Sequence, residues 1–153
     1  MGHRFLRHTE RTKVITLVVD IDGFQLKSSH PFRSPVETVI LLLKELLLYQ
    51  DLLLDRPLLL VLNKMDIDNA ERKKDEILSE LENIKHHPLI HDSGLSSDLL
   101  PVLEKFCENN FQNVFPVSSL TGSGVDEFRN FLYEQVPKNN LFEDDHGDND
   151  GLE

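Results

Sequence analysis

The sequence predicts an α/β fold in which three parallel strands alternate with helices. Three short apolar stretches, at residues 13–20, 57–63 and 114–117, have the length and aliphatic composition of buried strands. Helical periodicity of apolar residues follows each of them. Strands that alternate with helices imply a parallel sheet joined by right-handed crossovers. We therefore expect a three-layer arrangement, with the sheet lying between flanking helices.

The first unit joins strand 13–20 to a helix that reaches about Gln50. Ser34 and Glu37 form a capping box, because each side chain can accept a hydrogen bond from the backbone N–H of the other. Pro35 suits the first helical position. The leucine-rich stretch 39–54 is predicted to be a core helix, since polar residues interrupt it at Lys44, Glu45, Gln50 and Asp51.

The second unit joins strand 57–63 to a helix that Asp68 and Glu71 are expected to cap. One apolar stripe of this helix comprises Ile77, Leu81 and Ile84. A short helix from about Asp98 then places three apolar residues on one face: Leu99, Leu103 and Phe106.

The third unit joins strand 114–117 to a last helix, whose apolar face comprises Val125, Phe128 and Leu132. Thr121 or Ser123 is expected to cap this helix. The core thus draws on all three units, and one domain suffices for the chain length.

Asn63, Lys64 and Asp66 follow strand 57–63 at the point where it ends. Open α/β sheets bind ligands at this carboxyl edge. The Asp66 carboxylate can accept hydrogen bonds from N1–H and the exocyclic amine of guanine, a donor pair that adenine lacks. Asn63 can hold the N7/O6 side of the base or tie neighbouring loops, and the Lys64 stem can lie over the ring. The pattern predicts guanine recognition, although a simple strand-to-loop turn can contain the same residues.

Ser118, Ser119 and Leu120 follow strand 114–117 and form a second candidate element. Guanine-nucleotide-binding domains have a Ser-Ala-x turn here, whose backbone offers an N–H group to guanine O6. Ser119 replaces that Ala, which is a small-for-small change that keeps the backbone donor. Both elements, in this order and separated by a helix, favour guanine as the ligand.

These motifs, with residues 2–12 and 18–25, resemble the Obg family of GTPases, and its animal branch most of all. The resemblance runs to about residue 136 and covers only the carboxyl-terminal half of that family's G domain. It implies an incomplete P-loop NTPase fold over residues 13–137, preceded at residues 1–12 by a remnant of the helix after the second switch. It also implies GTP or GDP as ligand, and an intracellular role in large ribosomal subunit assembly, in the mitochondrion or nucleolus.

The phosphate-binding loop of that family, Gly-x4-Gly-Lys-Ser/Thr, has no counterpart here, because none of the seven glycines precedes a Lys. In the family this loop and the metal-linked Asp-x-x-Gly precede the region matched. No catalytic or metal-binding residue is therefore predicted, and Mg²⁺ is expected only where the upstream half is present. The alternative is a non-catalytic remnant that binds a partner protein through the unpaired edge of residues 14–19 or an acidic tail. With that edge open, a stable monomer is not expected.

Asp20-Ile21-Asp22-Gly23 admits other interpretations, because it formally matches the metal-linked Asp-x-x-Gly. It also resembles the Asp-x-Asp-Gly of haloacid-dehalogenase-like phosphatases, in which the first Asp is a nucleophile. Such a phosphatase needs a second acidic pair beside strands, and the downstream cluster at 143–145 lacks apolar neighbours. We favour a strand end that turns through Gly23.

The net charge of −11 argues against a general nucleic-acid binder, so we expect no DNA partner. Residues 138–153 are predicted to form a disordered acidic tail.

The single cysteine, Cys107, excludes a disulfide framework and is expected as a buried thiol on a helical face. The histidines His86, His87 and His91 lack metal-ligand spacing and are expected to lie in a solvated loop. The arginines Arg4, Arg7 and Arg11 are expected on a solvated helix face, with RNA contact as the alternative.

Overall fold

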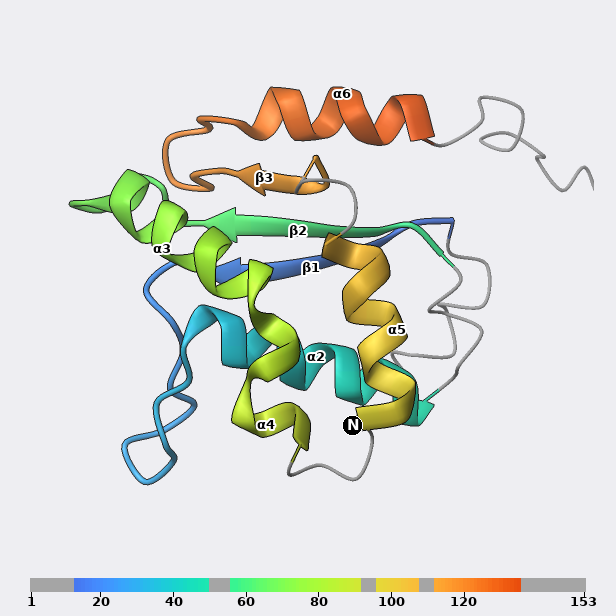
Figure 1. Cartoon of the computed structure of the whole chain (residues 1–153). Coiled ribbons are helices and arrows are strands. Elements are labelled where there is room, and N and C mark those ends of the chain that lie inside the picture. Colours follow the sequence, from blue (N-terminus) through green and yellow to red (C-terminus); the bar gives the residue numbers. More distant parts are fainter. Residues whose placement is uncertain (1–12, 50–55, 92–95, 108–111, 136–153) are drawn as a thin grey trace, which may run out of the picture.

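The computed structural model describes residues 13–49, 56–91, 96–107 and 112–135. Its elements, in chain order, are β1 (Ile15–Asp20), α2 (Pro35–Tyr49), β2 (Leu58–Asn63), α3 (Ala70–Glu82), the 3₁₀ helix η3 (Ile84–His86), α4 (Pro88–His91), α5 (Ser96–Cys107), β3 (Val114–Pro116) and α6 (Val125–Gln135) (Figure 1). The predicted helix remnant at 1–12 and the predicted tail at 138–153 lie outside the described residues, as do the three arginines of the former.

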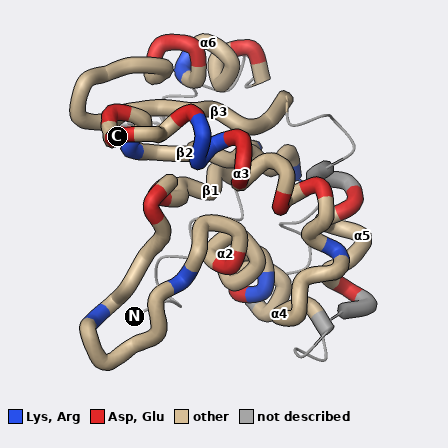
Figure 2. Tube along the Cα trace, turned by 60° about the vertical axis from the view of Figure 1, so that its left-hand side comes forward, with Lys and Arg blue, Asp and Glu red and all other residues tan. Residues whose placement is uncertain are grey.

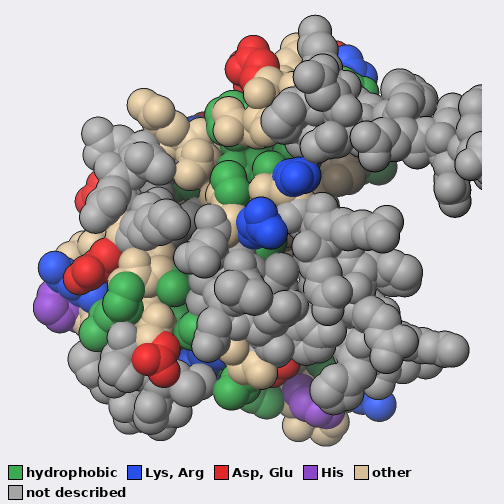
Figure 3. Space-filling view, turned by 90° about the vertical axis from the view of Figure 1, so that its right-hand side faces the viewer, with side chains coloured by type: hydrophobic (Ala, Val, Ile, Leu, Met, Phe, Trp, Pro, Cys, Tyr) green, Lys and Arg blue, Asp and Glu red, His purple; other side chains and the backbone are tan. Residues whose placement is uncertain are grey.

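The three strands form one parallel sheet in the order β1-β2-β3, as the alternation of strands and helices predicts. Asp20 pairs in register with Asn63, and Leu62 pairs with Pro116, so all three strands end at one edge. The strands are shorter by one or two residues than the stretches predicted from sequence. Figure 3 shows the opposite end of the molecule, at the amino ends of the strands, where hydrophobic and basic side chains lie together.

One face of the sheet packs against α2, α3 and α5 (Figure 1). Leu17 and Leu60 are register partners and lie on this face, as do Val19 and Leu62. The helices contribute fully buried residues at helical spacing: Val36, Val39, Ile40, Leu43, Leu81, Leu99 and Leu103. This face holds most of the core. The members of the predicted stripes whose side chains the structure describes are buried in it: Ile77, Leu81, Ile84, Leu99 and Leu103.

The other face of the sheet packs against α6. Val61 pairs in register with Phe115, whose ring lies 5.3 Å from that of Phe128 and 4.9 Å from that of Phe131, between ring centroids. The contact therefore uses Phe131 as well as one residue of the predicted stripe. No residue of α6 is fully buried. Val18, on the same face of β1, is 61% exposed, so α6 covers only the part of this face near β3.

β1 is an edge strand of the described sheet, since β2 is its only partner there. This is the open edge that the sequence predicts for residues 14–19. Edge strands with exposed apolar residues can pair with other chains. That the chain is not a stable monomer stays a prediction.

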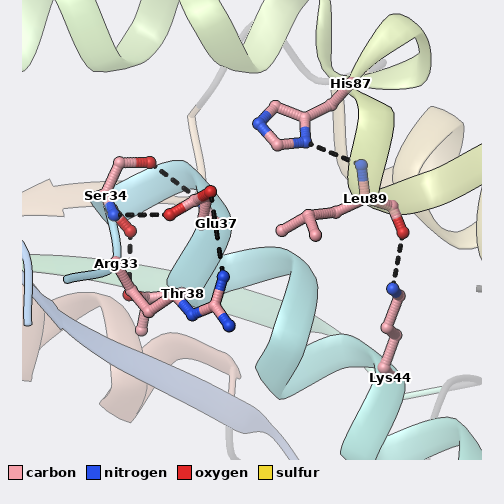
Figure 4. Close-up of polar contacts among 7 residues, drawn as sticks. All are labelled: Arg33, Ser34, Glu37, Thr38, Lys44, His87 and Leu89. Carbon is pink, nitrogen blue, oxygen red and sulfur yellow. Dashed lines mark hydrogen bonds and ion pairs between the residues drawn. The ribbon is translucent and has the colours of Figure 1, made fainter. Parts of the chain in front are cut away.

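The start of α2 is the capping box that the sequence predicts (Figure 4). The Ser34 N–H donates to Glu37 Oε2 at 3.0 Å, and the Glu37 N–H donates to Ser34 Oγ at 3.1 Å. Pro35 is the first helical residue. Two backbone donors at the helix start are thus satisfied by side chains, which confirms the prediction.

The start of α3 differs from the prediction that Asp68 caps it. The residue before the helix is Asn69, in the left-handed region with φ 60°, and its side chain makes no capping hydrogen bond. The Ala70 N–H donates instead to the Ile67 carbonyl at 3.3 Å. The Ile67 N–H in turn donates to the Lys64 carbonyl at 3.2 Å. The helix start is therefore tied to the loop after β2, which delays it beyond the Asp68 position.

The histidine region is helical rather than the solvated loop that was expected. Ile84 and Ile90 are buried and anchor η3 and α4 to the core. The Lys44 ammonium of α2 donates to the Leu89 carbonyl, and the His87 Nδ1 accepts the Leu89 N–H at 3.3 Å (Figure 4). These two turns are stabilised by burial of Ile84 and Ile90 against other elements, which local sequence periodicity does not reveal.

Helix α5 begins at Ser96, two residues before the predicted start. The side chains of Phe106 and Cys107 lie outside the described residues, so the buried thiol stays a prediction. Among the helices that the structure describes, none combines the length and the apolar character that crossing a bilayer requires.

Replacing Ser34 tests the capping box. Ser34→Ala leaves the Glu37 N–H without its acceptor, and we expect the free energy of unfolding to fall by about 1 kcal/mol. Urea denaturation followed by circular dichroism measures it. Ser29→Ala, in an exposed loop, is the control and should change stability by less than about 0.5 kcal/mol. Equal effects of both substitutions would contradict the role of the cap.

Candidate functional site

The ends of the three strands bring the predicted site residues together at one edge of the sheet. The Val117 N–H donates to the Leu62 carbonyl at 2.8 Å, and the Met65 N–H donates to the Val117 carbonyl at 3.0 Å. These bonds extend the β2–β3 pairing past the ends of both strands. As a result, the loop after β3 lies against the loop after β2.

Asp66 is held by the loop after β3. The Ser118 hydroxyl donates a short hydrogen bond to Asp66 Oδ1, and Ser118 Oγ accepts the Thr121 N–H at 3.1 Å. Ser118 is only 1% exposed, whereas Asp66 is exposed to solvent. A carboxylate has two oxygens and about four lone-pair sites. Asp66 can therefore accept further hydrogen bonds from a ligand while Ser118 fixes its orientation.

Asn63 is held by the same loop. Its Oδ1 accepts the Ser119 N–H at 3.0 Å and the Ser119 hydroxyl at 2.9 Å. Because a backbone N–H can only donate, the atom facing it must be the amide oxygen, which leaves Nδ2 as the remaining donor. Of the two predicted roles for Asn63, the structure shows the tie between loops. The Ser119 N–H, expected to be offered to guanine O6, bonds to Asn63 in this structure.

Lys64 has an unusual backbone, with φ 71° in the left-handed region. Such a conformation costs free energy in a residue with a Cβ and persists where neighbours fix it. Two backbone hydrogen bonds hold it: the Ile67 N–H donates to the Lys64 carbonyl at 3.2 Å, and the N–H of the next residue, Met65, donates to the Val117 carbonyl at 3.0 Å. The ammonium pairs with Asp20 Oδ2. The hydrogen bond to Asp20 is the largest cause of a raised pKa of Lys64, and Coulomb attraction to the same carboxylate is the second.

Asp20-Ile21-Asp22-Gly23 is a turn, which confirms the favoured interpretation. The Gly23 N–H donates to the Asp20 carbonyl at 3.0 Å, and Gly23 has φ 81°. A Cβ there would lie 2.6 Å from the Arg33 carbonyl oxygen, so Gly is required. Asp22 pairs with Lys73 of α3, and this hydrogen bond, with the accompanying Coulomb attraction, lowers the pKa of Asp22. Figure 2, in which this edge comes forward, shows acidic and basic positions side by side there.

The rest of the loop after β3 is solvent-facing. Leu120 is 83% exposed, and Gly122 and Gly124 have φ 83° and 73°. Thr121 Oγ1 accepts the Ser123 N–H at 3.3 Å inside the turn. The prediction that Thr121 or Ser123 caps α6 is wrong, because neither residue directly precedes the helix, which begins at Val125. Gly124 instead directly precedes the helix, and its carbonyl accepts the Phe128 N–H.

Asp20 lies beside the predicted site residues, but it was not predicted from the sequence to belong to the site. The signal was present, because β1 and β2 each end in a polar residue and adjacent parallel strands end together. Within the described part of the chain, no group of three or more His, Cys, Asp or Glu is placed to hold a metal ion.

The two loop glycines provide a matched test of the turn after β3. A Cβ on Gly124 would lie 2.2 Å from the Pro116 carbonyl oxygen, whereas a Cβ on Gly122 meets nothing within 4 Å. Both Ala substitutions carry the left-handed cost of about 1–2 kcal/mol. We expect Gly124→Ala to lower the unfolding free energy by at least about 1 kcal/mol more than Gly122→Ala, from overpacking against backbone. Equal losses in urea denaturation would contradict this close approach.

Comparison with known proteins relates the sequence to one family, although no protein-family model matches it. GTP-binding protein 10 of Homo sapiens is 40% identical over 152 residues, covering 99% of this chain and 36% of that protein. GTP-binding protein 10 of Xenopus tropicalis is 47% identical over 126 residues, covering 82% and 31%. The GTPase Obg of Desulfitobacterium hafniense is 36% identical over 127 residues, covering 83% and 22%. The chain is therefore a homologue of GTP-binding protein 10 and of the Obg GTPases, and it spans about a third of the length of the former.

Proposed function

We propose that this chain binds the guanine base of GTP or GDP at the carboxyl edge of its sheet. The observation that carries the proposal is the Asp66 carboxylate, oriented by the buried Ser118 hydroxyl and open to solvent on its remaining lone pairs. Guanine presents two adjacent donors, N1–H and the exocyclic amine, and a carboxylate accepts both. Homology to GTP-binding proteins supports the same ligand.

Asn63 and Ser119 are proposed to recognise the other side of the base. Because Asn63 Oδ1 faces the Ser119 backbone, its Nδ2 is the group available to guanine N7. The Ser119 hydroxyl also donates to Oδ1 and can hold Asn63 alone, which would release the Ser119 N–H for guanine O6. Lys64, through its methylene stem, and Leu120, through its exposed apolar side chain, are proposed to cover the two faces of the ring.

The family resemblance extends this proposal to a role in assembly of the large ribosomal subunit. An intracellular site, in the mitochondrion or the nucleolus, follows from the same resemblance. The groups proposed here contact only the base, so Mg²⁺ and catalysis enter only with the upstream half of the family's G domain.

A second candidate function is a protein-interaction module. The open edge of β1 and the 61% exposure of Val18 favour it. The two candidates separate in one measurement: sedimentation of the purified chain with and without guanosine. A nucleoside-independent self-association that Val18→Lys abolishes would favour the interaction module.

Base contacts without phosphate contacts should give weak and undiscriminating binding. A few charge-assisted hydrogen bonds, each about 1.5–3 kcal/mol, must offset the entropy of association. We expect dissociation constants near about 1 mM, with GTP, GDP and guanosine almost equal. Titration followed by NMR chemical shifts measures this range. Micromolar GTP with much weaker guanosine would reveal a phosphate site outside the proposed residues.

The same reasoning predicts no GTP turnover by this chain alone. In-line attack on the γ-phosphate needs a phosphate cradle, a magnesium ligand and a positioned water. The proposed site provides none of these groups. Phosphate release by the purified 153-residue chain should equal that of a boiled control, and a clear excess would overturn the prediction.

Asp66→Asn tests the base assignment directly. In either orientation, an Asn amide sets its NH2 against one of the two guanine donors, whereas xanthine offers an oxygen where guanine has its amine. We expect guanosine affinity to fall at least about tenfold, on the scale of one charged hydrogen bond, and xanthosine affinity to rise. The initial slopes of NMR chemical-shift titrations, recorded at a pH where xanthosine is neutral, measure the guanosine and the xanthosine affinity.

Asp68→Asn is the matched control. Asp68 is exposed, and its substitution removes the same charge two residues away from Asp66. It should leave the ratio of guanosine to xanthosine affinity unchanged. If Asp66→Asn leaves this ratio unchanged as well, guanine is not read by Asp66 and the proposal fails.

A further inference from the structure

We propose that Asp20, at the end of β1, is a positioning residue that holds Lys64 in place for the purine before any ligand arrives. This inference rests on the proposed guanine site and assigns it a residue outside the loops after β2 and β3. It follows from three observations: the strand register, the division of the Asp20 carboxylate between two donors, and the backbone conformation of Lys64.

The strand register brings the two side chains together. Asp20 is the direct parallel partner of Asn63, which immediately precedes Lys64. The Ile21 N–H donates to the Asn63 carbonyl at 3.0 Å, so the pairing of β1 with β2 continues to the last residue of each strand. The positive φ of Lys64 then turns the chain out of the sheet at this point. Its ammonium pairs with Asp20 across the sheet edge.

The Asp20 carboxylate is itself fixed. Its Oδ1 accepts the Asp22 N–H at 3.0 Å, and its Oδ2 faces Lys64. Its side chain is 22% exposed, against 56% for Lys64, so the anchor is the more buried member of the pair. One oxygen thus holds the turn of β1, and the other holds the lysine.

The other carboxylates near Lys64 are engaged elsewhere. Asp22 pairs with Lys73 of α3, and Asp66 accepts the Ser118 hydroxyl. Each adds a Coulomb attraction that raises the pKa of Lys64 less than Asp20 does. Asp20 is therefore the one carboxylate, among the described residues, that forms an ion pair with it.

Fixing the ammonium also fixes the methylene stem, and the stem is the part proposed to cover the base. A lysine stem has several rotatable bonds, and ordering it on binding costs conformational entropy. When Asp20 orders it in advance, the ligand no longer bears that cost. The function of Asp20 is thus to strengthen base binding without touching the base.

Asp20→Asn tests the proposal with little change of shape. The Asn oxygen still accepts the Asp22 N–H, while its NH2 group then faces the Lys64 ammonium and cannot accept from it. We expect guanosine binding by the full 153-residue chain to weaken about two- to tenfold, the cost of ordering one long side chain. Asp22→Asn is the matched control, which breaks only the pair with Lys73, and it should leave guanosine affinity within about twofold.

A double-substitution cycle separates positioning from general damage to the fold. Lys64→Met keeps an unbranched side chain but removes the ammonium, so Asp20 has nothing left to hold. In the Lys64→Met background, Asp20→Asn should change guanosine affinity by less than about 1.5-fold. Equal weakening in both backgrounds would show that Asp20 acts only through the fold, and would overturn the proposal.

A measurement without nucleoside keeps this inference distinct from the guanine proposal. The ¹³Cε resonance of Lys64, titrated with pH, should show a lower pKa in Asp20→Asn than in the unaltered chain, and Asp22→Asn should shift it less. If Asp20→Asn leaves this titration unchanged, the ion pair is absent and the inference fails. If the shift occurs but guanosine binds nowhere, the guanine proposal fails and takes the positioning role with it.

Discussion

The hydrogen-bonded register of β2 between β1 and β3 is the constraint on which the rest of the structure depends. Residues Leu59–Leu62 of β2 are buried on both faces, and both edges of the strand are paired. Parallel pairing makes neighbouring strands end together, so the polar residue after each strand arrives at the same edge. The candidate site is therefore a consequence of strand pairing, which brings the loop after β2 against the loop after β3 although the contacting residues are 52 and 56 positions apart in sequence.

At that edge, each polar group is held by a different strand from its own. Asp66 and Asn63, after and at the end of β2, are held by Ser118 and Ser119 after β3. Lys64 is held by Asp20 of β1. Cross-strand ties of this kind fix side chains without burying them, because the partner's backbone is already fixed by the sheet. An exposed but ordered set of donors and acceptors is what recognition of a flat base requires.

The sequence predicted the features that depend on local patterns. The capping box of Ser34 and Glu37 was predictable because it needs only two residues three positions apart. Asp68 failed as a cap because the loop from Lys64 to Asn69 folds back through its own hydrogen bonds, which shifts the helix start. The turns of η3 and α4 were missed because their stability comes from burying Ile84 and Ile90 against other elements, not from helical periodicity.

For the site, the sequence by itself determined which chemical groups the chain offers at the ends of β2 and β3: a carboxylate, an amide, a lysine stem and a small-residue turn. These follow from residue identity and the positions where apolar runs end. Only the tertiary structure decided how the groups are shared: that Asn63 faces Ser119, that Ser118 is buried beneath Asp66, and that Lys64 pairs with Asp20. The reason is physical. Such contacts depend on strand register and backbone conformation, and both are set by packing of the whole sheet against its helices.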